Sequence, residues 1–255
     1  MFEFLDISEY MGMPAAGSAH APMVDYMMAL VHWLMFILLL GWGVYFIYVL
    51  FRFRAGKNPK ASYEGAVGKY SKVQEAVVIL AESALLVGFA FPVWGQLKND
   101  FPAENTAFEV HIIAEQFQWN IHYPGEDGKF GSRDIHLIDL ATNPIGLDES
   151  DPAGDDDLVM VNELHLPVDR DVIIQLSTKD VIHSFGVPEF RVKQDAIPGL
   201  VIPIWFTPTL EGEFEIACAQ LCGLAHYRMR GYVTVEEQGV VDSWIRQMIE
   251  EGAAF

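Results

Sequence analysis

The stretch that decides the fold of this chain is Gly212–Val235, GEFEIACAQLCGLAHYRMRGYVTV. It contains both cysteines of the protein, and Cys218 is followed by Cys222, His226 and Met229 at steps of four, four and three residues. Thiolate, imidazole and thioether groups together suit copper better than a hard cation. The stretch therefore predicts a site for a soft metal ion.

Two simpler interpretations compete with a metal site. Steps of three and four residues would place all four side chains on one face of a helix. However, Glu213–Ala217 alternates like a strand, Gly231–Val235 is β-branched and aromatic, and Gly223 interrupts the residues between them, which favours a ligand-bearing loop. A disulfide between the two cysteines is the second alternative, but it gives no reason for His and Met at fixed further steps.

A further metal donor is expected from a distant strand. Asp180–Pro188, DVIHSFGVP, supplies His183 in an apolar run that follows a strand expected at Val172–Ser177. Two thiolates and two imidazoles could bind zinc as a Cys2His2 site, but zinc would leave Met229 unexplained. Alternatively, the two sulfurs bridge two copper ions, with one histidine on each.

The string C-A-Q-L-C-G-L-A-H-Y-R-M at residues 218–229 resembles the binuclear copper A loop of cytochrome c oxidase subunit II. That family also has a D-V-I-H segment and a K-x-D-x-x-P-G segment, which read here as Asp180–His183 and Lys193–Gly199. The resemblance covers nearly the whole chain, including two N-terminal membrane spans. It implies two copper ions held by six groups: the side chains of His183, Cys218, Cys222, His226 and Met229 and the backbone carbonyl of Gln220.

The charge of the chain is divided unevenly. Residues 1–98 contain seven acidic and seven basic side chains, whereas residues 99–255 contain 28 acidic and nine basic ones and carry the whole net charge of −19. A neutral apolar part followed by an acidic part predicts a membrane anchor and a water-facing domain. The acidic balance disfavours nucleic acid as a partner and favours a basic protein.

The N-terminal part is expected to be a transmembrane hairpin at residues 26–98, preceded by an irregular segment at 1–25. Residues 26–51 lack charge and exceed the ~20 residues that cross a bilayer, and a second apolar span is expected at about 75–97. The stretch Arg52–Lys72 between them has six basic residues and one acidic residue. The positive-inside rule places this loop in the cytoplasm of a bacterial inner membrane, with both termini and the copper domain on the periplasmic side.

Two acidic residues of the hairpin require an explanation. Glu75 lies at the start of the second span, where it is either a solvated helix-start charge or, by the resemblance, the carboxylate where protons enter a channel of the large subunit. Glu82 lies about two turns deeper, where an acid is costly and usually faces another protein or a water-filled path. It either pairs with a group of a partner subunit or is protonated in the helix bundle.

The acidic part, residues 99–255, is expected to form an all-β cupredoxin-like sandwich or barrel, because β-rich runs alternate with clusters of Gly, Pro, Asn and Asp. The expected strands are Ala107–Ala114, Trp119–Tyr123, Asp134–Ile138, Leu158–Leu166, Val172–Ser177, Leu200–Phe206, Gly212–Ala217 and Gly231–Val235. Gly239–Glu250 is expected to form a C-terminal surface helix.

The chain departs from the family pattern at three places. In Ala114–Pro124, AEQFQWNIHYP, Phe117 replaces the Trp where electrons usually arrive, so electrons are expected to arrive near Phe117 or Trp119. Gln220 replaces a Glu that binds magnesium, and an amide is a weaker ligand for a hard cation, so the resemblance does not carry the magnesium site over. Pro198–Leu200 replaces P-G-R, which removes a partner of the large subunit's haem groups.

The resemblance implies the electron-accepting subunit of a respiratory haem-copper oxidase, with no catalytic residue in this chain. Electrons would come from cytochrome c, or from a haem c domain associated with the complex, and pass to haem in subunit I, where oxygen is reduced to water with proton translocation. Leu147–Asp157 and Asp180 are candidates for docking the donor. A membrane-anchored copper carrier or delivery protein is the alternative, whereas a quinol oxidase subunit would lack the copper ligands.

Overall fold

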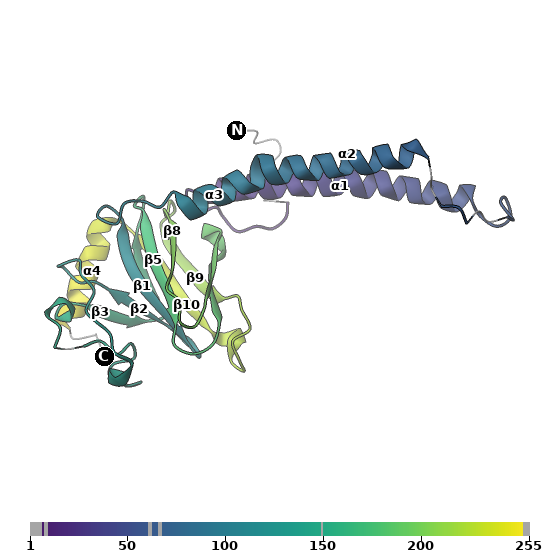
Figure 1. Cartoon of the computed structure of the whole chain (residues 1–255). Helices are drawn as coiled ribbons and strands as arrows, with labels where there is room; N and C mark the ends of the chain where they lie inside the picture. The colour runs from purple at the N-terminus through teal and green to yellow at the C-terminus, as the bar shows by residue number, and fades with distance from the viewer. Residues whose placement is uncertain (1–6, 8–9, 61–62, 66–67, 149, 252–255) are drawn as a thin grey trace. The chain divides into compact units, whose positions relative to one another are not determined.

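The structure is a computed structural model that describes residues 7, 10–60, 63–65, 68–148 and 150–251. The chain divides into two compact units. One is helical and ends at Asn99, and the other is rich in β-structure, begins at Asp100 and also includes Pro14–Pro22. Figure 1 shows the order of the elements within each unit.

The helical unit contains two long apolar helices. The first is α1 (Ala21–Arg52), and the second runs from Lys69 to Asn99 as α2 (Lys69–Leu85), a π-helical turn η2 (Leu86–Ala90) and α3 (Phe91–Asn99). Their most apolar windows have mean hydropathies of 2.4 and 2.2, and both helices are long enough to cross a membrane. The two predicted spans are confirmed as elements of the fold.

The π-helical turn η2 was not among the predicted elements. Pro92 lies two residues after the end of this turn and has no N–H, and in a regular α-helix its ring would clash with the carbonyl of Gly88. A wider turn relieves that clash while the helix continues. The turn therefore has a local cause in the sequence.

The β-rich unit is a sandwich of two five-stranded sheets, which confirms the predicted cupredoxin-like architecture. The first sheet has the order β3-β2-β1-β5-β8, formed by Leu158–Val161, Gln118–Tyr123, Phe108–Glu115, Val172–Thr178 and Ile202–Phe206. The second has the order β4-β10-β9-β6-β7, formed by Glu163–Pro167, Arg230–Glu236, Gly212–Cys218, His183–Val187 and Val192–Ala196.

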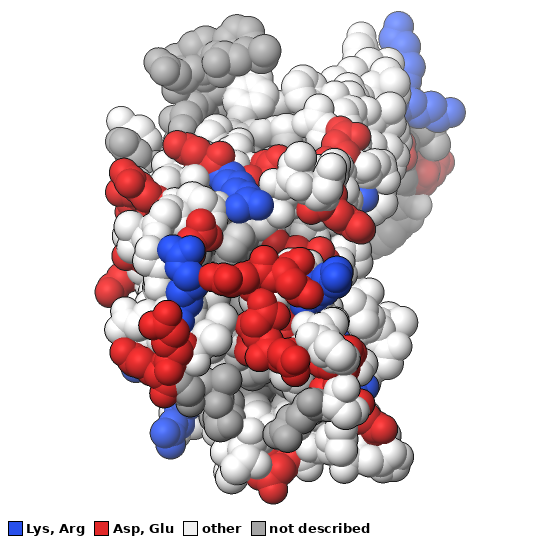
Figure 2. Space-filling view, turned by 90° about the vertical axis from the view of Figure 1, so that its left-hand side faces the viewer, with Lys and Arg blue, Asp and Glu red and all other residues white. Residues whose placement is uncertain are grey.

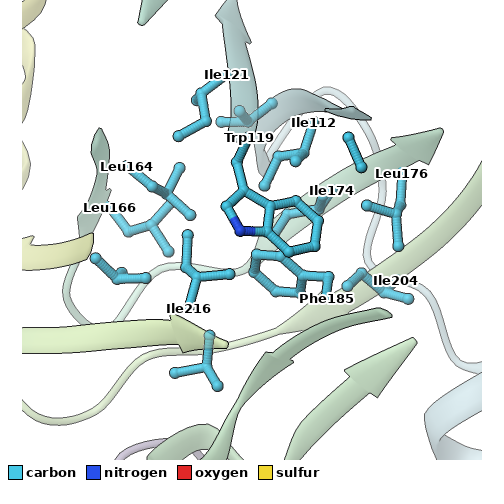
Figure 3. Close-up of a cluster of buried hydrophobic side chains, with 14 of the residues drawn as sticks. Ile112, Trp119, Ile121, Leu164, Leu166, Ile174, Leu176, Phe185, Ile204 and Ile216 are labelled. Atoms are coloured by element: carbon cyan, nitrogen blue, oxygen red, sulfur yellow. The ribbon is translucent and has the colours of Figure 1, made fainter. Parts of the chain in front are cut away.

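The core lies between the two sheets and is built around Trp119. Figure 3 shows its indole ring surrounded by Ile112 and Ile174 of the first sheet and by Phe185 and Ile216 of the second. The rings of Trp119 and Phe185 meet edge to face, with centroids 5.8 Å apart. Burying a side chain of this size contributes about 1.5–3 kcal/mol, so Trp119 is a principal stabilising residue of the sandwich.

The predicted strand Leu158–Leu166 is in fact two strands that belong to different sheets. The chain turns at Asn162, which has a φ of 61°, a left-handed conformation that asparagine tolerates. The side-chain oxygen of Asn162 accepts a hydrogen bond of 2.9 Å from the backbone N–H of Trp119. Asn162 is therefore the point where the chain crosses from one sheet to the other.

One further strand prediction needs correction and two strands were missed, while the other six predicted runs are confirmed. The predicted strand Asp134–Ile138 is a short 3-10 turn, because the Asp134 carboxylate accepts the His136 N–H at 2.8 Å and bends the chain. Strands β6 and β7 were not predicted. Each has only five residues, and the sequence of β7, VKQDA, is largely polar, so neither gives a strong strand pattern.

The outer face of the first sheet is covered by an insert, residues 124–157. Ile145 of the insert packs with Ile113 and Val159 of the sheet in a small apolar cluster. The predicted C-terminal helix is confirmed as α4 (Gln238–Glu250), and its Trp244 stacks on His165 with ring centroids 3.7 Å apart.

The segment before the first helix is fastened to the sandwich. The backbone N–H of Gly17 donates to Glu189 at 2.8 Å, and the Thr209 N–H donates back to Gly17 at 2.9 Å. Residues 14–22 therefore belong to the β-rich unit, although the sequence indicated only an irregular leader.

Candidate metal centre

The two cysteines lie at the end of β9 and in the loop that follows it. Cys218 is the last residue of β9, Cys222 lies in the loop, and Met229 directly precedes β10. The helical interpretation of this stretch is therefore wrong, apart from one short turn at His226–Arg228. Both cysteines are free, and their sulfurs are 3.8 Å apart.

The structure brings five predicted side-chain donors together. The Nδ1 atom of His183 lies 3.0 Å from the Met229 sulfur and 4.0 Å from the Cys218 sulfur. The Cys222 sulfur lies 3.8 Å from the Met229 sulfur and 3.6 Å from Nδ1 of His226. Metal–sulfur bonds of ~2.3 Å allow two donors at such separations to share one ion.

Most of these donors are shielded from water. His183 is fully buried, and Cys218, Cys222 and Met229 are each less than 10% exposed, whereas His226 is half-buried. The backbone carbonyl of Gln220 also faces the cluster, 3.2 Å from the Cys218 sulfur. The set is soft and poor in oxygen, so these residues fit copper better than a hard cation.

Asp180 orients His183 toward the sulfurs. The Nε2 atom of His183 donates to the Asp180 carboxylate at 2.8 Å, which leaves Nδ1 free to face the donor cluster. The same carboxylate accepts the backbone N–H of Gln116 at 2.7 Å and that of Val181 at 2.6 Å. This arrangement is the carboxylate–histidine pairing that fixes metal-binding imidazoles in other proteins.

The two thiols differ in acidity. Burial opposes ionisation of Cys218, but hydrogen bonds with the His183 ring and the Ser184 backbone outweigh it and lower the Cys218 pKa to about 6. Burial and the neighbouring Cys218 sulfur raise the pKa of Cys222 to about 11. The pair therefore retains one proton near neutral pH, which a metal ion must displace.

Two residues that shape this centre escaped the sequence analysis as functional positions. The Gln116 side chain donates to the Cys222 carbonyl at 2.6 Å, and no sequence pattern signalled this contact. Gly223 has a φ of 138°, and a Cβ there would lie 2.6 Å from Gln116 Nε2 and 3.1 Å from the Phe117 ring. Its position inside the cysteine loop could have indicated the close approach.

The two aromatic candidates for electron arrival lie in different environments. Phe117 is half-buried and covers Gly223 of the cysteine loop. Trp119 is fully buried in the core, with its ring centroid 6.3 Å from that of His183. A docked donor therefore cannot touch Trp119, whose packing Figure 3 illustrates, and the arrival of electrons near Phe117 or Trp119 stays a prediction.

The acidic loop Leu147–Asp157 is more than a solvated run, although residue 149 lies outside the described part. Hydrogen bonds from the backbones of Ser132 and Ala153 hold the pKa of Asp151 below its usual range. Asp156 accepts the Glu126 N–H at 2.6 Å, and Asp157 is buried. Several of these carboxylates therefore build the insert, while Figure 2 shows that acidic groups crowd one face of the molecule.

The fold and the donor set define a cupredoxin-like protein with two helices that suit a membrane anchor and a candidate site for a soft metal ion. Comparison with known proteins names the family. A family profile described as "Cytochrome C oxidase subunit II, periplasmic domain" matches residues 108–236. The chain is 38% identical over 205 residues to "Alternative cytochrome c oxidase subunit 2" of Bradyrhizobium diazoefficiens, covering 80% of this chain and 72% of that protein.

Two further proteins are similar to this chain. Cytochrome c oxidase subunit 2 of Cereibacter sphaeroides is 28% identical over 255 residues, covering 94% of this chain and 83% of that protein. The crystal structure of the periplasmic domain of cytochrome oxidase subunit II from Bradyrhizobium japonicum matches with a TM-score of 0.43 and 27% identity, over 59% of this chain and 97% of that one.

The chain belongs to the cytochrome c oxidase subunit II family. It is a subunit of a haem-copper oxidase, the one that receives electrons, and a component of that enzyme rather than its catalytic subunit.

Proposed function

We propose that the β9–β10 loop holds two copper ions, with Cys218 and Cys222 bridging them. His183 and His226 then bind one ion each, Met229 is a weak ligand, and the Gln220 carbonyl completes the set. The observation that carries this proposal is the convergence of two thiols, a thioether and two imidazole nitrogens within 4.0 Å contacts. When bound, such a copper pair supplies a one-electron carrier.

Residues around the donor loop shield the proposed copper pair from water and hold its ligands in position. Asp180 holds the His183 ring, and Gln116 holds the Cys222 carbonyl, so segments from both sheets brace the loop. Phe117 closes the surface over Gly223. Magnesium binding at Gln220 is not part of the proposal, because the side chain is an amide.

The tip of the loop is suited to contact with another protein. Leu221, Leu224 and Tyr227 are 78%, 97% and 82% exposed, although they are large and apolar. Exposed apolar groups of this kind mark interaction sites. We propose that this tip packs against the oxidase subunit that receives the electrons, and that the donor approaches near Phe117.

The membrane part supports a proposed orientation. The polar stretch between the two long helices is basic, which favours a cytoplasmic position, so both termini and the β-rich unit would face the periplasm. Glu75, exposed on the second turn of α2, is then at the cytoplasmic end. We propose that it is the carboxylate where protons enter the path toward the large subunit.

The donor that we favour is a haem c domain associated with the complex, with a free basic cytochrome c as the alternative. Phe117 in place of the family's Trp supports a non-standard contact, and a tethered donor needs little charge steering. Oxygen consumption with soluble cytochrome c over a range of ionic strength separates the two. Fast turnover at low salt that collapses with added salt would defeat the tethered donor. A Phe117→Trp variant should help only the free cytochrome.

Purification in mild detergent tests the function against the copper-delivery alternative. We expect co-purifying haem subunits and two copper ions per chain. A solitary chain that carries one exchangeable copper ion would favour delivery instead. Metal analysis and haem spectra of the same fraction give both readouts.

A further inference from the structure

An acidic residue in the apolar part of α2 has no role in the function proposed above. Glu82 lies six residues after Ala76, the first residue of the apolar run, which corresponds to about 9 Å of helix. A carboxylate at such depth is rare in membrane helices and usually faces another protein or a water-filled path. Glu82 therefore points to a function in the membrane part.

Glu82 lies on the same side of the helix as Glu75. Both belong to the uninterrupted α-helix Lys69–Leu85, and seven residues correspond to nearly two full turns, so the carboxylates are about 20° apart around the axis and about 10 Å apart along it. The partly buried residues of this helix, Val78, Ala81 and Leu85, form a neighbouring stripe. The two acids lie beside that stripe, on a side that the chain itself leaves exposed.

Neither carboxylate has a partner within the part of the chain that the structure describes. No hydrogen bond or ion pair with another described residue reaches Glu75 or Glu82, and both are exposed. Beyond Glu82 the same side continues with Leu86 and Phe89, which are apolar, so the line of acids ends at Glu82. The π-helical turn begins at Leu86, whose N–H bonds to the Glu82 and Ser83 carbonyls. Such turns are frequent at functional sites.

We propose that Glu82 is the second carboxylate of the proton path that begins at Glu75, a proposal that rests on the proton-uptake role assigned to Glu75 above. The surface that faces both acids is the membrane-embedded part of the catalytic subunit. Each carboxylate takes up one proton from the cytoplasmic side and releases it on the deeper side, so neither group is consumed. Hydrogen bonds of ~2.8 Å imply a chain of about three water molecules across the 10 Å between them.

The test uses the intact oxidase complex with Glu75→Gln, Glu82→Gln, the double variant and Glu82→Asp. Ser83→Ala is the matched control, since Ser83 is polar, at the same depth and rotated by about 100°. Proton uptake is followed with a pH dye, and copper reduction by the donor is followed separately by absorption. We expect Glu82→Gln to slow proton uptake by about tenfold or more, while copper reduction and the Ser83→Ala variant stay unchanged. Glu82→Asp should recover much of the rate.

The double variant decides whether the two acids share one path. On one path it should be no slower than the slower single variant, whereas independent effects would multiply. Multiplying effects, or unchanged proton uptake in Glu82→Gln, would overturn the proposal. Loss of the catalytic subunit from the Glu82→Gln complex would also overturn it, in favour of an ion pair between subunits. Failure of the wild-type copper centre to accept electrons would instead refute the proposed function.

Discussion

Two buried histidines of this domain are each held by an aspartate, yet only one of them lies in the candidate metal centre. His183 donates to Asp180 at 2.8 Å, and Nε2 of His122 lies 2.6 Å from the Asp157 carboxylate. The second nitrogen of His183 faces the sulfurs, whereas that of His122 is buried with no hydrogen-bond partner among the described residues. A carboxylate can orient an imidazole in either place, and the neighbouring donors decide whether a metal can follow.

The surroundings of His122 explain its different role. His111 lies opposite it on β1, and Phe130 of the insert stacks on His111 with ring centroids 3.7 Å apart. Asp157 also accepts the Gly131 N–H at 2.7 Å. Among the described residues, only His183, Cys218 and Cys222 form a close group of potential metal ligands. The His122–Asp157 pair is therefore a structural contact that holds the insert against the first sheet.

The largest effect is expected when a sulfur donor of the candidate metal centre is replaced. Cys218→Ser should abolish copper binding and the purple, electron-delocalised spectrum expected from the family resemblance, because a hydroxyl is neither soft nor readily deprotonated. Copper analysis and absorption of the refolded protein measure this. A single copper ion in the unaltered protein would contradict the two-copper centre. Bound zinc, with unchanged stability in the Cys218→Ser variant, would also contradict it.

The orienting aspartate should have the next largest effect. Asp180→Asn is expected to weaken copper binding by about 10–100-fold, the usual scale for the loss of such a partner. A competition titration with a chelator gives the affinity. If the affinity is unchanged and only the salt dependence of donor binding moves, then Asp180 serves docking rather than orientation.

The corresponding change in the other pair should affect stability instead of copper. Asp157→Asn weakens the acceptor that serves both His122 and Gly131, and we expect a loss of about 1–3 kcal/mol in the free energy of unfolding. Urea unfolding of the copper-free protein measures this loss. The copper spectrum should be identical to that of the unaltered protein, and a changed spectrum would mean that the two regions are coupled.

The acid sensitivity of the domain should depend on His111. Burial, followed by the charges of Arg133 and His122, lowers the His111 pKa to about 3 from an unfolded value near 6.5. Between these values the unfolded chain binds a proton that the folded chain does not, so stability falls as pH falls, by at most ~1.4 kcal/mol per unit. His111→Phe keeps the stack and should remove this contribution. Equal pH slopes in both proteins would refute the assignment.

The smallest effect is expected at the thioether. Met229→Leu should retain both copper ions but raise the redox potential, because a hydrocarbon stabilises the oxidised site less than a weak sulfur ligand does. Potentiometric titration of the copper absorption measures the change. Complete loss of copper would place Met229 among the essential ligands.

The sequence was sufficient for the elements whose signals are local. The uncharged run at residues 26–51, which lies within α1, predicts a span. The spacing of the four donors from Cys218 to Met229 predicts a donor loop, because a handful of neighbouring residues contains the whole pattern. His183 could be added because its segment, Asp180–His183, matches the D-V-I-H pattern of the family. The predicted site residues could therefore be recognised from short sequence patterns alone.

Long-range pairings were beyond the sequence for equally physical reasons. Asn162 divides one apolar run between two sheets, and nothing in that run marks the crossing. Gln116 reaches Cys222 across 106 positions, and Asp157 reaches His122 across 35. The full burial of Trp119 could not be predicted from its own segment, because residues of the opposite sheet cover it.

The bracing of the donor loop has a consequence for the speed of electron exchange. Gln116 joins the Cys222 carbonyl to the Asp180 carboxylate, and Asp180 in turn holds the His183 ring, so hydrogen bonds link three segments around the donors. A centre that gains and loses single electrons reacts fastest when its ligand positions hardly differ between the two oxidation states. Groups locked by their supporting hydrogen bonds meet that condition. If copper binds here as proposed, the network would keep the nuclear rearrangement of each electron transfer small, so that a short-lived encounter with the donor would be sufficient for turnover.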